Sequence, residues 1–452
     1  MFRIIPIAAI FIASLGCKAP IGCRDLGMVV RELQQRTCTQ IPTSTPPCSV
    51  IIPAGVQLDD GLSQDEAITT ALANNSAFQA TLEQLHMASG DVRQSELLAN
   101  PQVLIYFPVG NKQGQYTIYG PIESYLMRPT RVKIANREFR RIGDQLVQNG
   151  LTLVRDVRNA YIDLSLAEEQ KKLADESVEL RSRISEITNK RLKDGDISEL
   201  ETLTARVDML NAQAAAGLQE QSVSILNHRL VMLMGVPWNE ELLRSEIMQP
   251  TNRPKASREE LVQLALQYRP DYQAANWAVA AAVERERLSK WLFFRMDAAL
   301  DARSNGGNGF QIGPGMRFDL PIFNKNEGGF ERASAERLAA MHARDAIRDQ
   351  IVMEVRTGYD QVVQAEQNLT IIKDKVMPAI EDAVGIAQKG FAGGGTDYLL
   401  ILQTTTQYLD ARLRLMTQTA AMHRALSELE RGVGCCLEAI SPAPQDMETP
   451  SQ

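Results

Sequence analysis

A long-range repeat is the feature that most constrains the fold of this chain. Residues 157–161 read VRNAY, and about 198 residues later residues 355–359 read VRTGY. A second pair follows at nearly the same offset, since GDISEL from Gly195 resembles GGTDYL from Gly394. The period is far longer than that of a solenoid repeat. The 452 residues are therefore expected to form two similar halves of one elongated body rather than several independent domains.

Each half is expected to be mainly helical. Val154, Val157, Tyr161 and Leu164 recur at spacings of three and four, the pattern of a coiled-coil seam. The pattern from about 128 to 193 predicts a rod on the order of 100 Å long. Two shorter helices beside each long helix would give a uniform helical wall. The expected helices are 62–98, 128–193 and 198–234 in the first half, and 258–290, 326–389 and, after a turn over 390–396, a return helix to about 430 in the second.

Two strand pairs interrupt the helices, at about 102–109 with 115–126 and at about 295–304 with 309–320. Strands of about ten residues with one apolar and one polar face are typical of transmembrane β-strands. The expected lipid-facing residues are Phe310, Ile312, Met316, Phe318 and Leu320. The expected residues of a water-filled lumen are Asp297, Asp301, Arg303, Gln311, Arg317 and Asp319.

Aromatic residues crowd around these strands, which favours a membrane over the alternative of a soluble, half-buried sheet. The first pair is less clearly oriented, because Val103, Leu104, Ile105 and Tyr106 are apolar on both faces. Four strands cannot close a barrel, and an open edge in lipid would leave backbone groups unpaired. Three copies would supply twelve strands, so the sequence predicts a homotrimer whose helices continue as a tube.

The N-terminus indicates export. Residues 1–16 combine Arg3 with a short apolar run, which has the length of a signal peptide and not of a membrane span. The run ends in SLGC, so lipidation of Cys17 is expected, with ordinary secretion and nearby cleavage as the alternative. Residues 17–60 read as a tether rich in Pro and Cys. Residues 435–452 read as a disordered tail.

Other function classes find little support in the composition. The net charge of −7 argues against nucleic acid as a partner. The four histidines are scattered, so no metal, cofactor or catalytic site is expected, and an enzyme is disfavoured. The cysteines outside Cys17 permit peripheral disulfides whose pairing stays open; they are Cys23, Cys38, Cys48, Cys435 and Cys436.

The ordered motifs resemble those of the TolC-like outer-membrane efflux protein family. PIE at residues 121–123 and LPIF at 320–323 end the strand pairs, and the two VRx(A/G)Y motifs and the two Gly turns follow in the same order. The resemblance covers residues 61–251 as a first repeat and 252–434 as a second. It implies a β-barrel in the outer membrane and an α-helical tunnel in the periplasm. The PIE motif also resembles the heavy-metal branch of the family.

The resemblance implies a passive conduit of a tripartite efflux or type I secretion system, with a periplasmic adaptor and an inner-membrane transporter as partners. It places the two helical turns at a periplasmic mouth that opens, although a plain hairpin turn is the alternative. Relatives carry two acidic residues where this chain has Leu400 and Gln403. The expected mouth residues are Asp194, Gly195, Asp196, Gly394, Gly395, Asp397, Leu400 and Gln403.

A competing interpretation is a lipid-tethered periplasmic adaptor, or structural coiled-coil protein, without a pore. Such a protein would carry one long helical hairpin between β-domains. Here the strands interrupt the helices twice, which favours the channel.

Overall fold

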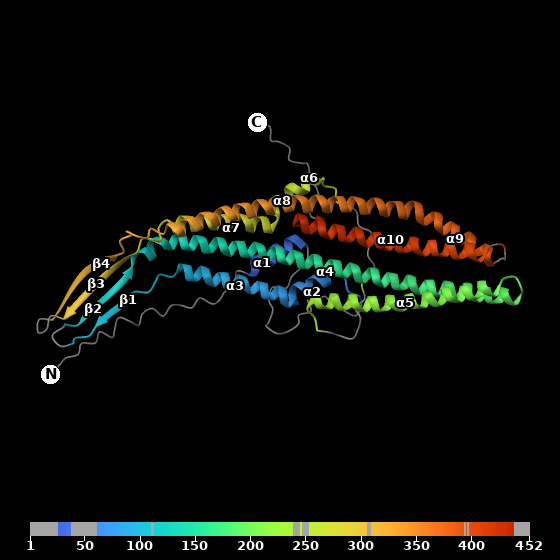
Figure 1. The fold of residues 1–452 in the computed structure, drawn as a ribbon, viewed down its shortest axis with the longest axis horizontal. Coiled ribbons are helices and arrows are strands. Elements are labelled where there is room, and N and C mark those ends of the chain that lie inside the picture. The colour runs from blue at the N-terminus through green and yellow to red at the C-terminus, as the bar shows by residue number, and fades with distance from the viewer. Residues whose placement is uncertain are drawn as a thin grey trace, which may run out of the picture.

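The computed structural model describes residues 26–37, 61–109, 113–237, 245, 253–304, 309–392, 395 and 397–437. The molecule is a long rod with a small sheet at one end and two helical turns at the other (Figure 1). Cys17 and Gly394 lie outside the described residues. Among the described residues, no helix combines the length and the apolar character that a membrane crossing requires.

The chain passes twice through the sheet end of the rod. The first half contains α1 (Leu26–Thr37), α2 (Gln64–Asn74), α3 (Ser76–Glu96), β1 (Gln102–Tyr106), β2 (Gln115–Pro121), α4 (Ile122–Lys193) and α5 (Glu199–Met234). The second half contains α6 (Arg258–Tyr268), α7 (Pro270–Ser289), β3 (Met296–Ser304), β4 (Phe310–Phe318), α8 (Glu327–Ile371), the π-helix η3 (Ile372–Val376), α9 (Met377–Ala392) and α10 (Tyr398–Val433).

The strands form one antiparallel sheet in the order β1, β2, β3, β4. β2 ends at Pro121, where helix α4 begins, so the expectation of a strand to residue 126 is wrong. Glu123 lies in the first helical turn, where the helix dipole favours an acid. Its carboxylate also accepts the backbone N–H of Met296 at 3.1 Å, which ties the start of α4 to β3.

The helices expected over 62–98 and 258–290 are each broken in two, which differs from the single helices expected. Asn75 ends α2 and caps α3, because its side chain accepts the backbone N–H of Phe78 at 2.9 Å. In the second half Pro270 begins α7, and the residue before a proline disfavours helical geometry. Both breaks lie near the middle of the rod (Figure 1).

The second long helix is also interrupted. The π-turn of η3 separates α8 from α9, and Pro378 follows inside the first turn of α9. A proline there removes one backbone hydrogen bond, and π-turns are typical sites of helix bending. The long helix expected from 326 to 389 is therefore present but contains a π-turn, whereas α4 runs as one regular α-helix for 72 residues.

Helix α1 lies within the segment that reads as a tether, and it packs against α4. Val29 and Leu33 are fully buried in the first core. Gly150 makes room for Leu33, since a Cβ at this glycine would lie 2.6 Å from a Leu33 methyl. At the other end of the chain Cys436 is buried, and its N–H donates to the Arg36 carbonyl at 2.9 Å. The first residues of the expected tail are thus part of the folded body.

Three clusters of buried side chains hold the rod together. The first joins α1, α2, α4 and α5, and includes Leu146, Val157 and Leu164. The second joins α6, α8 and α10 around Val355 and Leu429. The third lies near the two helical turns at the far end of the rod. Both VRx(A/G)Y motifs place their valine in a core, which explains their common spacing.

Candidate functional site

The sheet has one continuous apolar face. The register pairs Ile118 with Leu300, and Leu300 with Pro314, so apolar side chains lie side by side across three strands. Val103 and Ile105 lie opposite Ile118 and Tyr116, which orients the first hairpin. Most of these side chains are exposed in the protomer, and the set is Val103, Ile105, Tyr116, Ile118, Leu300, Ile312, Met316 and Phe318.

The opposite face of the sheet carries a polar network. Thr117 and Gln115 each donate to the Asp301 carboxylate at 2.8 Å, and Thr117 is only 3% exposed. Arg303 donates to the other oxygen of Asp301 at 2.9 Å. This network binds β2 to β3 and fixes the orientation of the acid.

A second polar group lies nearer the helices. Arg317 donates to Asp297 on the neighbouring strand at 2.9 Å, and its guanidinium stacks 4.7 Å from the centre of the Tyr119 ring. Five of the six residues expected in a lumen share this face: Asp297, Asp301, Arg303, Gln311 and Arg317. Asp319 and Leu320 lie beyond the end of β4, so the strand does not assign them to a face.

The far end of the rod has two turns of different construction. At the first turn Gly195 has a φ of +81°, which favours glycine. Ser198 and Glu201 form a capping box that begins α5. The backbone and side-chain hydrogen bonds from Ser198 hold the pKa of Glu201 below its usual range. The neighbouring acids Asp194, Asp196 and Glu199 are exposed.

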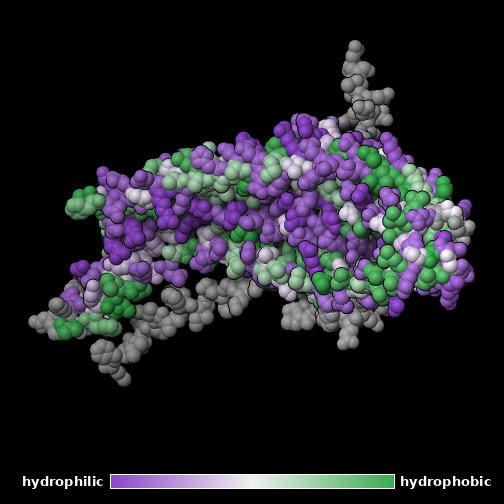
Figure 2. Space-filling view, turned by 45° about the vertical axis from the view of Figure 1, so that its right-hand side comes forward, coloured by the Kyte–Doolittle hydropathy of each residue, from purple (hydrophilic) through white to green (hydrophobic). Residues whose placement is uncertain are grey.

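At the second turn Gly395 donates its N–H to the Gly390 carbonyl at 2.9 Å. Asp397 precedes α10 without a side-chain capping bond. Leu400 and Gln403 are both exposed, as are several other apolar residues close by, including Leu399 and Ile386. Apolar side chains gather on the surface at this end of the molecule (Figure 2).

The two turns are joined by a buried contact. Phe391 and Tyr398 of the second hairpin pack with Ile184 and Ala205 of the first. The Tyr398 hydroxyl donates to Asp208 on α5 at 2.8 Å. Burial and this hydrogen bond raise the pKa of Tyr398 above its usual range. This end of the protomer is thus held by one aromatic cluster and one polar link.

Ion pairs continue this link along the rod between α4 and α10. Asp163 on α4 accepts from Arg424 at 2.6 Å, and Arg229 of α5 lies 3.6 Å from the same carboxylate. Glu176 pairs with Arg412 nearer the two turns, and Arg155 pairs with Glu428 at 3.3 Å nearer the middle of the rod. The pairs with Arg424, Arg412 and Glu428 join the first half of the chain to the second, whereas the contact of Arg229 with Asp163 lies within the first half.

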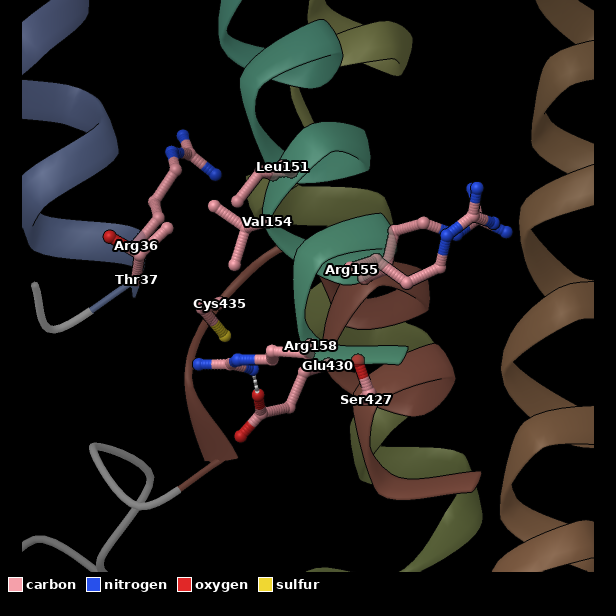
Figure 3. Close-up of a pocket in the computed structure, with 10 residues that line it drawn as sticks. Arg36, Thr37, Leu151, Val154, Arg155, Arg158, Ser427, Glu430 and Cys435 are labelled. Carbon is pink, nitrogen blue, oxygen red and sulfur yellow. Dashed lines mark hydrogen bonds and ion pairs between the residues drawn. The ribbon is translucent and has the colours of Figure 1, made fainter. Parts of the chain in front are cut away.

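A small crevice lies where α1, α4 and α10 meet (Figure 3). Its volume is about 20 Å³, which holds about one water molecule and no solute. Arg158 and Glu430 form an ion pair inside it. The crevice is therefore a packing contact between helices rather than a binding site.

Asp144 on α4 lies near Arg36, which lines this crevice. Burial raises its pKa to about 6, although the hydrogen bond with Trp277 and the nearby Arg36 act in the opposite direction. Within the described residues, no group of three or more His, Cys, Asp or Glu side chains is arranged to hold a metal ion.

Sequence comparison decides the family. The chain matches the outer membrane efflux protein family over residues 67–236 and 261–434. It belongs to this family. Each matched stretch contains one strand pair and one long helical hairpin, so the repeat in the sequence corresponds to the repeat of the family. Membership confirms the expected resemblance and favours an outer-membrane channel over a tethered adaptor.

Individual relatives agree with this assignment. The chain is 24% identical to the cobalt-zinc-cadmium resistance protein CzcC of Cupriavidus metallidurans over 389 residues, which covers 82% of this chain and 90% of the relative. The CusC channel structure superposes with a TM-score of 0.71 at 15% identity, over 87% of this chain and 98% of CusC. The CmeC outer membrane channel of Campylobacter jejuni gives 0.71 at 12% identity, over 86% and 90%.

The sequence did not reveal which residues link the two hairpins. Tyr398 and Asp208 are 190 positions apart, and neither stands out in the sequence. The sequence contains a helical pattern for α1, because Val29, Val30 and Leu33 have helical spacing. The proline-rich flanks of this segment obscured the pattern.

Proposed function

We propose that this protein is a passive homotrimeric conduit that carries solutes from the periplasm across the outer membrane. The observation that supports the proposal most strongly is the four-stranded sheet, which has one continuous apolar face and one polar face. A soluble protein would cover such an apolar face with other elements, yet here it is exposed. In a barrel the apolar face would meet lipid, and the polar face would line a wet lumen.

The edges of the sheet support a trimer. Among the described residues, no other strand pairs with the outer edge of β1 or of β4. Backbone groups left unpaired in lipid are costly, so each edge needs a partner. Pairing β4 of one copy with β1 of the next would close a barrel of twelve strands when three copies join.

Within the described residues, one face of α5 in the helical wall is also left uncovered. Leu200, Leu203, Val207 and Leu210 follow one another at spacings of three, four and three, and each is about half exposed or more. Leu218 and Ile225 extend this stripe toward the middle of the rod. A neighbouring copy beside α5 would bury the stripe and continue the tunnel below the barrel.

The two turns would form the periplasmic mouth of this tunnel. Asp194, Asp196, Leu400 and Gln403 are exposed there and would meet a periplasmic adaptor or the passing solute. An inner-membrane transporter would complete the system and supply both energy and selectivity. The link from Tyr398 to Asp208 would hold the mouth until the adaptor docks. Lipidation of Cys17 would add an anchor in the membrane.

A divalent metal cation is our proposed cargo, because the relative CzcC is named for cobalt, zinc and cadmium resistance. A conduit needs no tight metal site of its own, so this cargo is compatible with the helical tunnel. Deleting the gene should raise sensitivity to these metals and leave sensitivity to organic drugs unchanged. The reverse pattern would assign the conduit to a drug exporter.

The molar mass in detergent tests the trimer directly. Light scattering with the detergent contribution subtracted should give three times the mass of the mature chain. A monomer released without detergent would contradict the conduit.

A pair of arginine substitutions tests the two faces of the sheet. Leu300 lies in the middle of β3 on the apolar face, so Leu300→Arg should cost about 2–4 kcal/mol and reduce the trimer in the outer membrane. Gly313→Arg is the matched control on the polar face, where an added Cβ would meet nothing within 4 Å. Equal loss of trimer in both variants would contradict the proposed orientation.

A further inference from the structure

We propose that the junction between sheet and helices binds anionic phospholipid headgroups of the periplasmic leaflet. The inference rests on the proposed barrel, and it names four cations as the binding groups: Arg128, Lys290, Arg295 and Lys325. We call them the junction cations. They come from three separate crossings between the sheet and the helices, at the ends of β2, β3 and β4 nearest to the long helices.

Exposed apolar side chains mark each of these crossings. Tyr125 and Leu126 are 60% and 65% exposed, Trp291 is 61% exposed, and Phe323 is fully exposed. Aromatic residues favour the boundary between hydrocarbon and water. Each crossing therefore has an apolar residue at the boundary and a cation within three positions of it, on the sequences YLMR, KWLFFR and FNK.

The junction cations are positioned but not neutralised. Arg128 donates to the Glu96 carbonyl at 2.7 Å, and Lys290 lies 5.0 Å from the centre of the Phe330 ring. All four side chains belong to exposed residues. In the part of the chain that the structure describes, none of the four forms an ion pair, although most arginines of the rod do.

The backbone segments that carry Lys290 and Lys325 are tied together. Asn326 donates its side-chain N–H to the Ser289 carbonyl at 2.8 Å, which ties the residue after Lys325 to the residue before Lys290. Asn326 also has a φ of +61°, so this joint is conformationally specific. Like charges repel, and an anion between the two ammonium groups would relieve that repulsion.

Nearby carboxylates do not neutralise the cluster within the protomer. Glu123 accepts the N–H of Met296, and Asp319 and Glu327 are exposed without an ion pair to the junction cations in the described part of the chain. Glu327 lies in the first turn of α8, where the helix dipole favours it.

The distance from the sheet fits a headgroup. Arg128 lies six residues after the start of α4, which is about 9 Å along the helix. The headgroup region extends about 5–8 Å beyond the hydrocarbon on each side, and long cationic side chains reach back toward it. Phosphates in this region would therefore be within reach of Arg128, and the other three cations lie in the short connections next to β3 and β4.

Native mass spectrometry of the full-length trimer in detergent tests the proposal. The trimer is mixed with equal amounts of phosphatidylglycerol and phosphatidylcholine, and the ratio of bound lipids is measured. We expect at least fivefold enrichment of phosphatidylglycerol, since each cation near a charged lipid surface strengthens binding by roughly this factor. The test variant combines Arg128→Gln, Lys290→Gln, Arg295→Gln and Lys325→Gln, and it should bring the ratio close to one.

A matched variant controls for the loss of charge. Lys190→Gln, Lys193→Gln, Arg206→Gln and Lys389→Gln remove four exposed cations near the mouth, far from the membrane. This variant should keep the enrichment. Equal binding of both lipids to the unmodified trimer, or equal loss in both variants, would overturn the proposal.

Two further arms separate the alternatives. Loss of enrichment on addition of inorganic phosphate at the headgroup concentration would overturn lipid binding in favour of a free-anion site. Trimer mass and single-channel conductance are recorded for every sample. A trimer that conducts without enrichment overturns this inference alone, whereas the absence of a trimer overturns the proposed function beneath it.

Discussion

The two halves of the rod contain the same kind of helix junction, but different side chains stabilise it in each half. In each half a return helix ends at a left-handed glycine, which lies against the break between the two short helices. In the first half Gly235 meets Asn74 and Asn75, and Asn75 donates to the Leu233 carbonyl at 2.9 Å. In the second half Gly434 meets Arg269 and Pro270. A duplicated plan thus preserves the backbone arrangement more closely than the side chains that stabilise it.

The second joint is ionic and nearly fully buried. Arg269 is 2% exposed, and it pairs with Glu354 at 2.6 Å and Asp271 at 2.9 Å. Burial alone would raise the pKa of Glu354, but the hydrogen bond from Gln350 and the nearby Arg269 hold that pKa below its usual range. The first joint relies instead on neutral amides and on the core beneath α1.

Removing the buried arginine should have the largest effect. Arg269→Met leaves Glu354 without its main cation and should destabilise the protein by about 3–5 kcal/mol, as expected for a broken buried pair. Asn75→Ala, at the corresponding joint, should cost only about 1–2 kcal/mol through the lost cap. Thermal unfolding in detergent would measure both. Similar losses in the two variants would show that the joints do not differ in the way described.

Adding a methyl group at the two glycines should have the next largest effect. Gly235→Ala should cost about 2–4 kcal/mol, because its Cβ would lie 2.5 Å from the Asn74 carbonyl oxygen in addition to the left-handed strain. Gly434→Ala should cost about 1–2 kcal/mol, since the nearest atom is 3.3 Å away. Urea unfolding would compare them, and a larger loss at Gly434 would contradict the packing of the first joint.

The stability of the first half should also depend on pH, through the titration of Asp144. Its folded pKa of about 6 lies above the unfolded value, so the protonated form stabilises the fold at low pH and this contribution is lost as pH rises from about 4 through 6. Asp144→Asn should therefore raise stability by about 1–3 kcal/mol at pH 7.5 and have little effect at pH 4. Melting temperatures across this range would reveal the trend. A constant difference at all pH values would contradict it.

The two turns at the mouth should differ least. Ser198→Ala removes a capping box and should cost about 1 kcal/mol, whereas Asp397→Ala removes a residue without a capping bond and should cost a few tenths. Hydrogen exchange of the first turn of α5 and of α10 would detect this local difference. Faster exchange in α10 after Asp397→Ala would show that this side chain does cap the helix.

The sequence by itself determined the duplicated plan, the long helices and the alternation of the strands. These follow from local periodicity, because Val157 and Val355 mark buried seams, and because Phe318 and Arg317 must point to opposite faces of one strand. The family follows from the same ordered motifs. Breaks such as Asn75 and the π-turn at Ile372 depend on packing as well as on local preference, so periodicity alone missed them.

Only the tertiary structure decided which distant residues meet. The register brought Asp301 to Thr117 and gave the first hairpin an apolar face, because pairing between strands depends on the whole sheet and not on one segment. The packing of α1 on Gly150, the link from Tyr398 to Asp208 and the hydrogen bond from Asn326 to Ser289 likewise join positions far apart in sequence. Such contacts arise where the energy of packing selects one arrangement among many that local preferences allow.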